Sequence, residues 1–170
     1  MRIAFTGPES SGKTTLSKWL STELSDSDYI PEFAREYLEE RKIVRVCEND
    51  FTQIVKNQSS LFNKITSSNY QIFDTDIFVL RIWNDEVFLL QLPELEIVPS
   101  FNMDIHFLCA PDVEWEVDPL RSSPAQAERE RLFEKYKIEL RNSQVKFIVL
   151  SGSLAEKKSL ILSSVRNSSI

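Results

Sequence analysis

The stretch from Gly7 to Thr14 constrains the fold of this chain more than any other, because it has the pattern G-x-x-x-x-G-K-T. It follows the short apolar run of residues 2–7 and precedes residues 14–25, in which apolar residues recur at helical spacing. The chain has only three glycines, and two of them lie in this one pattern. A strand, a glycine-containing turn and a helix in this order predict a phosphate-binding loop.

The chemistry of phosphate binding explains each part of the pattern. Glycine lets backbone N–H groups turn toward phosphate oxygens, and the N-terminus of the next helix adds positive charge. Lys13 would reach the β- and γ-phosphates, and the Thr14 hydroxyl would be a ligand of Mg²⁺. A chance match in a turn is the alternative, expected in roughly one per cent or less of chains of this length. The expected nucleotide contacts are Gly7, Pro8, Glu9, Ser10, Ser11, Gly12, Lys13, Thr14 and Thr15.

The remainder of the chain alternates short apolar runs with helical patterns. We expect further strands at 28–32, 70–73, 103–111 and 146–152, and helices at 14–25, 33–41, 49–68, 77–90, 128–140 and 153–166. The proline-bounded residues 92–99 are expected to form a loop. This alternation predicts a single α/β domain over residues 1–170 with a mostly parallel sheet. Gly152 ends the last strand, where it could lie beside the nucleotide base or form an ordinary turn.

Composition excludes several classes of protein. Hydrophobic residues at 42% and charged residues at 27% are globular values. The apolar runs are too short to cross a bilayer, and the start of the chain lacks a signal-peptide layout, so we expect a cytoplasmic protein without a membrane partner. A net charge of −6 argues against a nucleic-acid surface. Cys47 and Cys109 are far apart and form no metal-binding motif.

Two aspartates follow the predicted strand at 70–73. Asp74 and Asp76 are two residues apart, so both would lie on one side of an extended chain. Buried carboxylates are costly without a metal or a partner, which favours a functional role over capping. Asp74 is the candidate Mg²⁺ ligand, and either aspartate could orient or deprotonate an acceptor hydroxyl, with Glu32 as the third candidate base.

Arginines gather in and after the irregular residues 112–127. This segment follows the fourth strand, where a mobile lid could lie, and Arg121 is the candidate catalytic cation. Arg129 and Arg131 alternate with glutamates, which fits a solvated helix face equally well. His106 lies in an apolar run and is expected to pack within a strand rather than to act in catalysis.

Several of these motifs occur together. The segments GPESSGKTTL, EFAREYL, FDTD and PDVEWEVDPLRSSPAQ, the last followed by RERLFEKYKIELR, resemble the ribosylnicotinamide kinase domain of NadR-type proteins. The resemblance extends over almost the whole chain. It implies a nucleotide-kinase-like, five-stranded parallel sheet flanked by helices, with a lid after the fourth strand. Because the chain starts at the phosphate-loop strand, we expect a stand-alone kinase.

The resemblance also implies a reaction and an acceptor site. The reaction is the transfer of a phosphoryl group from ATP, with Mg²⁺, to the 5′-hydroxyl of nicotinamide riboside. By position, Glu32, Arg35 and Glu36 would face the acceptor pocket, Trp115 and Asp118 would help to enclose the substrate, and Arg121 would contact phosphate. Trp115 could equally stack on its own domain.

Two other functions stay open at this stage. One is a kinase of another nucleoside or small metabolite, which would keep the phosphate loop and change the acceptor pocket. The other is a nucleotide-dependent ATPase switch whose lid contacts a protein partner. ATP or GTP preference and oligomeric state are not fixed by these motifs.

Overall fold

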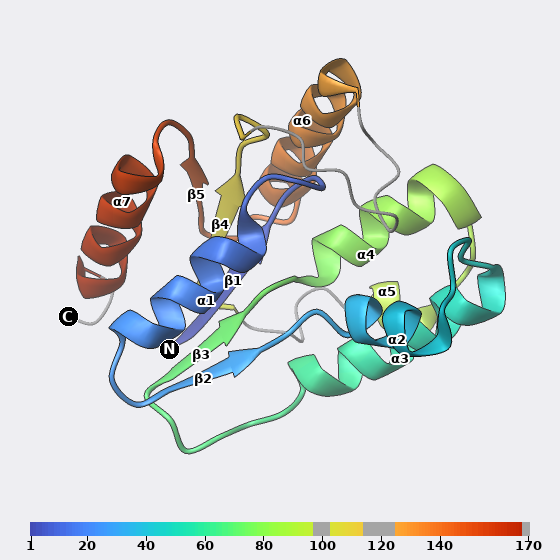
Figure 1. Ribbon diagram of the computed structural model, residues 1–170, viewed down its shortest axis with the longest axis horizontal. Helices are drawn as coiled ribbons and strands as arrows, with labels where there is room; N and C mark the ends of the chain where they lie inside the picture. The colour runs from blue at the N-terminus through green and yellow to red at the C-terminus, as the bar shows by residue number, and fades with distance from the viewer. Residues whose placement is uncertain (97–102, 114–124, 168–170) are drawn as a thin grey trace.

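The computed structural model describes residues 1–96, 103–113 and 125–167, and its centre is a parallel sheet (Figure 1). The sheet has five strands in the order β2-β3-β1-β4-β5. The strands are β1 (Arg2–Thr6), β2 (Ser27–Ile30), β3 (Tyr70–Phe73), β4 (Ile105–Cys109) and β5 (Phe147–Leu150). The predicted fold class, a nucleotide-kinase-like α/β domain, is confirmed. The predicted lid falls largely outside the described residues.

Helices cover both faces of the sheet. They are α1 (Lys13–Glu23), α2 (Phe33–Arg41), α3 (Glu48–Phe62), α4 (Ile77–Trp83), the π-helix η1 (Asn84–Phe88), α5 (Pro93–Glu96), α6 (Gln126–Asn142) and α7 (Leu154–Asn167). Among these, none combines the length and the apolar composition that a membrane-spanning segment requires.

Alternation along the strands builds two cores. Ile3 and Phe5 face one side of β1 and pack with α1 and α7, whereas Ala4 faces the other side and packs with the helices α2 to α6. Because both faces are covered, the central strands β1 and β4 are almost wholly buried. This explains why the strands appear in the sequence as continuous apolar runs.

Two details of the helices differ from the sequence prediction. Residues 93–96, expected to be loop, form the short helix α5. The helix expected over 77–90 is divided, since α4 continues into η1, and the buried Asn84 holds the end of this segment through two hydrogen bonds with the backbone of Leu90. The Asn84 side chain thus reaches forward to the chain six residues later, an interaction that helical spacing in the sequence does not predict.

Asp76 ties three elements together behind the phosphate loop. Its Oδ1 accepts hydrogen bonds from Thr6 Oγ1 at 2.9 Å and from the Val79 N–H at 3.2 Å, where it caps α4. His106 Nδ1 lies 2.8 Å from Asp76 Oδ2. The side chains of Thr6, Asp76 and His106 are buried. The expectation that His106 packs within a strand is confirmed, and its partner is this carboxylate.

Replacement of Asp76 by Ala should therefore destabilise the fold. The variant leaves buried polar groups of β1, α4 and β4 without their acceptor, so we expect the free energy of unfolding to fall by about 2–4 kcal/mol. Urea denaturation measures the change. The control is Glu40→Ala on the exposed face of α2, whose free energy of unfolding should be close to that of the wild type. A decrease in Asp76→Ala no larger than the decrease in this control would contradict the structural role of Asp76.

Candidate active site

Residues 7–12 join β1 to α1 and form the phosphate loop. Gly7 and Gly12 have φ angles of 130° and 85°, and Ser10, at 51°, also adopts a left-handed conformation. The Ser11 hydroxyl donates to the Pro8 carbonyl at 2.8 Å. Gly12 begins α1 without a side-chain cap, and the first turn of the helix carries no acidic residue. The N–H groups at this helix end are thus arranged to receive an anion.

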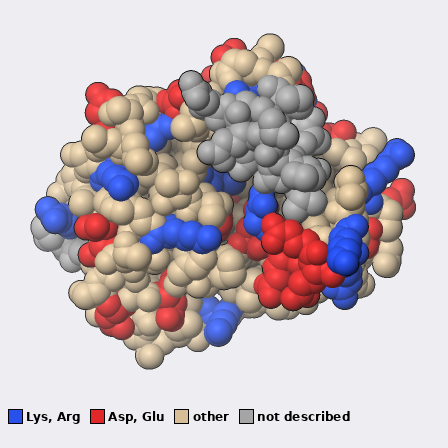
Figure 2. Space-filling view, viewed as in Figure 1, with Lys and Arg blue, Asp and Glu red and all other residues tan. Residues whose placement is uncertain are grey.

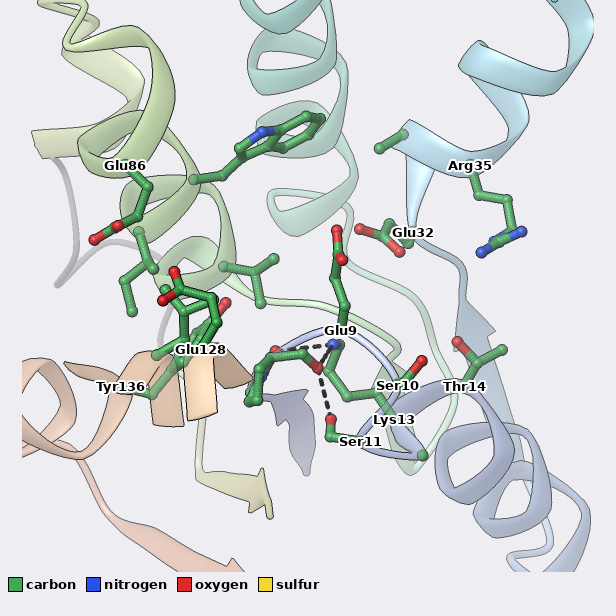
Figure 3. Close-up of a pocket in the computed structure, with 18 of the residues that line it drawn as sticks. Glu9, Ser10, Ser11, Lys13, Thr14, Glu32, Arg35, Glu86, Glu128 and Tyr136 are labelled. Atoms are coloured by element: carbon green, nitrogen blue, oxygen red, sulfur yellow. Dashed lines mark hydrogen bonds between the residues drawn. The ribbon is translucent and has the colours of Figure 1, made fainter. Parts of the chain in front are cut away.

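Lys13 lies at the mouth of the loop. Its ammonium donates to the carbonyls of Gly7 and Pro8, both at 2.8 Å, as the dashed lines of Figure 3 show. These bonds fold the side chain back over the loop instead of leaving it extended in solvent. The charge is held where the terminal phosphates of a nucleotide would lie against the loop.

A cavity of about 490 Å³ extends from the loop toward α2, α4 and α6 (Figure 3). Its floor is the predicted nucleotide-binding stretch Gly7–Thr15. Its walls are Glu32, Ala34, Arg35 and Leu38 from α2 and its N-cap, Val44 and Val46 from the next loop, Val79, Ile82, Trp83, Glu86 and Val87 from α4 and η1, and Val113, Glu128, Leu132 and Tyr136. The cavity therefore joins a polar floor, formed by the phosphate loop, to an apolar chamber with carboxylates on its walls.

Glu32 projects into this cavity from the N-terminus of α2 (Figure 3). Burial raises the pKa of its carboxyl group, and the negative charges of Asp74 and Glu9 act in the same direction, whereas Lys13 and Arg35 oppose them. A carboxylate with a raised pKa next to a phosphate loop has the property expected of a general base. Arg35 also lines the cavity, and its guanidinium pairs with Glu39 at 3.1 Å.

Two further glutamates on the cavity wall are paired across its edge. Glu86 of η1 accepts from Arg131 and from Lys135 of α6, the latter at 2.8 Å, and these bonds lower the pKa of Glu86. Arg131 also pairs with Glu128 at 2.7 Å. This network connects η1 to the helix that follows the predicted lid.

Asp74 lies beneath the loop, next to α1. Ser17 Oγ is 2.9 Å from Asp74 Oδ1 and 3.2 Å from the carbonyl of Thr14, and Tyr29 donates to Asp74 Oδ2 at 2.9 Å. Mg²⁺ in kinases is held by one or two protein oxygens plus phosphates and water. Ser17 thus lies between the Thr14 backbone and the Asp74 carboxylate, and the Thr14 hydroxyl and Asp74 are the residues predicted to supply such oxygens. The described residues contain no cluster of three or more His, Cys, Asp or Glu, and the ion needs none here.

Not all predicted site residues line the cavity. Glu32 and Arg35 do so, together with the whole phosphate loop. Asp74 and Asp76 are buried outside the lining, Glu36 is exposed on α2, and Gly152 donates its N–H to Asp112 at 2.7 Å. Their functional roles stay predictions. Trp115, Asp118 and Arg121 lie outside the described residues.

Arg129 does not belong to a solvated helix face, an alternative that the sequence left open. It is 3% exposed, and its guanidinium contacts the Ser10 carbonyl of the phosphate loop at 3.5 Å and the Val113 carbonyl at 3.4 Å. Arg131, in contrast, is exposed in the network with Glu86 and Glu128. The degree of burial therefore distinguishes these two arginines, which look equivalent in the alternating sequence AERERL.

Sequence reasoning missed the wall opposite α2. Trp83, Glu86, Glu128 and Tyr136 line the cavity, but they lie on helices whose apolar positions predict only core packing. Burial raises the pKa of Tyr136 well above its usual range, with the charges of Asp76, Glu32 and Glu9 adding to the shift. The only signal in the sequence was the position of these helices after strands that end at the same sheet edge.

The loop, the strand order and the helices on both faces define a P-loop protein of the nucleotide-kinase type. The chain belongs to the family described as AAA domain, whose pattern matches residues 2–157. No curated protein matches the chain in sequence.

Solved structures share the fold. A NadR protein in complex with NR superimposes with a TM-score of 0.74 at 20% identity, and a NadR protein in complex with NAD and AMP-PNP superimposes with a TM-score of 0.71 at 20% identity. These matches cover 99% of this chain and 50–51% of the NadR chains, so the chain spans about half their length. The predicted resemblance to the NadR-type kinase domain is confirmed at the level of the fold.

Smaller kinases match over their full length. Deoxyadenosine kinase from M. mycoides has a TM-score of 0.65 at 17% identity, covering 98% of this chain and 100% of the kinase. Thymidylate kinase from Ehrlichia chaffeensis has a TM-score of 0.64 at 15% identity, covering 98% and 97%. These likenesses establish the kinase-like fold and leave the acceptor to be argued from the cavity.

The two loop glycines should differ in their tolerance of a side chain. A Cβ on Gly7 would lie 2.7 Å from the backbone oxygen of Cys109, whereas a Cβ on Gly12 meets no heavy atom within 4 Å. Gly12→Ala then carries only the cost of its left-handed backbone, about 1–2 kcal/mol. Gly7→Ala adds a backbone clash and should cost more. Urea denaturation of both variants measures the two losses of stability. A loss in Gly12→Ala equal to or larger than that in Gly7→Ala would contradict the prediction.

Proposed function

We propose that this protein is an ATP-dependent kinase that phosphorylates the 5′-hydroxyl of a nucleoside, with nicotinamide riboside as its acceptor. The observation that carries the proposal is the single cavity that joins the phosphate loop to an apolar chamber bearing Glu32 and Arg35. Such a shape would allow two substrates to bind with their reacting ends next to each other.

The floor of the cavity would hold the phosphates of ATP. The loop amides and the N-terminus of α1 surround the β- and γ-phosphates, and Lys13 leaves the carbonyls of Gly7 and Pro8 to bind them. Thr14 and Asp74 are the residues that would hold Mg²⁺, which supplies neutralisation of phosphate charge. The buried Arg129, which contacts the loop at Ser10, adds positive charge on the side of the predicted lid.

The α2 wall would hold the reacting hydroxyl. The acceptor oxygen forms a bond to the γ-phosphorus as the bond from that phosphorus to the β–γ bridging oxygen breaks, and ADP leaves. The hydroxyl proton passes to the carboxylate of Glu32, whose position in the cavity makes it the preferred base over Asp74 and over Asp76. Asp76 is occupied by Thr6, Val79 and His106.

The apolar chamber would hold the base of the acceptor. Trp83 provides an aromatic wall, and the aliphatic side chains of Val79, Ile82 and Val87 lie beside it. Glu86 and Glu128 also line the chamber, where they are paired with Arg131 and Lys135 of α6. Trp115, Asp118 and Arg121 are further candidates from the family resemblance.

The test is a panel of nucleosides assayed for ATP consumption and for a phosphorylated product. The panel contains nicotinamide riboside, deoxyadenosine, cytidine and thymidine, and we expect the highest kcat/KM with nicotinamide riboside. A preference for deoxyadenosine would indicate a kinase of another nucleoside, which the likeness to deoxyadenosine kinase also allows. Slow ATP hydrolysis that no nucleoside stimulates would reject the kinase and favour a nucleotide-dependent switch.

Lys13→Ala should abolish turnover while preserving the fold. Loss of the ammonium that stabilises the transferring phosphoryl group is expected to lower kcat by about a thousandfold or more. Steady-state kinetics with nicotinamide riboside and ATP measure the change, and Lys18→Ala, an exposed lysine on α1, is the matched control. Near-normal kcat in Lys13→Ala would show that the loop does not carry the reaction.

The pH profile should report Glu32. A general base works in its ionised form, so kcat/KM should fall as the pH decreases through the pKa of Glu32. Because burial raises this pKa, the midpoint of the acid limb should lie above the ordinary glutamate value of 4.5. Glu32→Gln should lose most of kcat and remove this limb. If the same limb persists in Glu32→Gln, another group is the base, and Asp74→Asn becomes the next variant to compare.

A further inference from the structure

One face of α6 forms the wall of the cavity opposite α2 (Figure 3). Glu128, Leu132 and Tyr136 line the cavity, and their spacing of four residues places them on the same side of the helix. Exposure decreases along this row, from the partly exposed Glu128 to Tyr136, which is 4% exposed. Leu140, one turn further, is fully buried in the core. The cavity therefore deepens along α6, and Tyr136 lies at its inner end.

Tyr136 carries a polar group into an apolar part of the chamber. Leu132 lies one turn before it, and Val79 and Ile82 line the cavity from α4, which packs against α6. Burial raises the pKa of the Tyr136 hydroxyl well above its usual value, and the negative charge of Asp76 at the N-terminus of α4 adds to the shift. The phenol is therefore uncharged at neutral pH, and its O–H group can donate a hydrogen bond.

The four tyrosines of the chain differ in what their hydroxyls meet. The hydroxyls of Tyr29 and Tyr37 each donate to an aspartate, at 2.9 Å and 3.1 Å. Tyr70, at the start of β3, is partly exposed to solvent. Tyr136 is buried, and no group in the described part of the chain forms a hydrogen bond with its hydroxyl. Buried tyrosine hydroxyls usually have a partner, and one left without a partner costs free energy. A ligand in the cavity would supply that partner.

The charge around the acceptor region indicates which kind of ligand oxygen would bind there. The negative charges of Asp76 and Glu32 both act on the Tyr136 hydroxyl. Figure 2 shows Asp and Glu side chains gathered over the surface formed by α2, where Glu36 and Glu40 are exposed. A carboxylate or phosphate oxygen would be repelled by these groups, so an uncharged oxygen fits this position better.

We propose that Tyr136 is a substrate-binding residue whose hydroxyl donates a hydrogen bond to an uncharged, non-reacting oxygen of the acceptor nucleoside. This inference rests on the nucleoside kinase function proposed above. Ligand pockets are mostly apolar and use a few polar groups to fix the orientation of the ligand. The hydrogen bond would hold the acceptor at the inner end of the chamber, while its 5′-hydroxyl faces the phosphate loop.

Tyr136→Phe removes the hydroxyl and keeps the ring. Calorimetry on the whole chain should give a Kd for nicotinamide riboside about three- to tenfold higher than in the wild type, the effect of one lost neutral hydrogen bond. The Kd for ATP, whose phosphates bind the loop, should not change. Tyr70→Phe, at the opposite edge of the sheet from the phosphate loop, is the matched control and should keep both wild-type Kd values.

Urea denaturation separates a role in binding from a role in stability. If the partner of the hydroxyl is the ligand, Tyr136→Phe without ligand should unfold at a urea concentration no lower than the wild type. Tyr37→Phe, which loses the hydrogen bond to Asp50, should unfold at a lower concentration. Nicotinamide riboside should raise the midpoint less in Tyr136→Phe than in the wild type, because the variant binds it more weakly.

Two analogues of nicotinamide riboside identify the oxygen. One lacks the carboxamide of the base, and the other lacks the 2′- and 3′-hydroxyls of the ribose. An analogue that lacks the partner of Tyr136 should bind equally to the wild type and to Tyr136→Phe, because removal of either member of an interacting pair abolishes the coupling between them. An analogue that keeps the partner should show the full difference in Kd.

Failure of this inference can be told apart from failure of the proposed function. If nicotinamide riboside is phosphorylated but Tyr136→Phe binds it as tightly as the wild type does, the inference is refuted and the kinase function stands. The inference is also refuted if Tyr136→Phe lowers the urea midpoint as much as Tyr37→Phe, or if both analogues keep the full difference in Kd. If the wild type neither binds nor phosphorylates any nucleoside, the proposed function is rejected, and the inference built on it is rejected as well.

Discussion

The backbone conformation between β1 and α1 is the constraint on which the site depends. Gly7 and Gly12 adopt positive φ angles that turn the loop around its own amides, and no side chain fits at Gly7, where the backbone of Cys109 lies too close. The helix that follows begins without a side-chain cap. The loop thus leaves its N–H groups and the helix end for a ligand, and Lys13 completes the positive site by folding over the carbonyls.

Buried hydrogen bonds of Asp76 connect the end of β1, from which this loop leaves, to the helix that forms one wall of the cavity. Asp76 binds Thr6 at the end of β1, the N-terminus of α4 and His106 of β4. Since α4 and η1 carry Trp83 and Glu86, these hydrogen bonds connect the strand before the phosphate loop to the segment that forms this wall. Asp76, predicted as a candidate for catalysis, is thus held by structural hydrogen bonds. Asp74 is held by Tyr29 and by Ser17, whose hydroxyl also contacts the Thr14 carbonyl.

Charge is distributed within the cavity according to the two substrates it would receive. Cationic and amide groups lie at the floor, whereas Glu32 lies on the acceptor side, and the rim glutamates are bound by Arg131 and Lys135. The NadR and deoxyadenosine kinase structures share the scaffold at 20% and 17% identity. At this distance the scaffold is common and the side chains on its walls decide what each protein accepts.

The sequence by itself determined the phosphate loop, the order of strands and helices and the two-sided core, because each follows from local spacing: glycine and lysine at fixed intervals, and apolar residues at strand or helix period. The tertiary structure alone decided which side chains share the cavity. Trp83, Glu86 and Tyr136 reach it from helices distant in the chain, and Arg129 is buried where Arg131 is exposed, although both occur in one alternating run. These facts depend on how helices pack across the sheet, and spacing along one helix carries no information about the element packed against it.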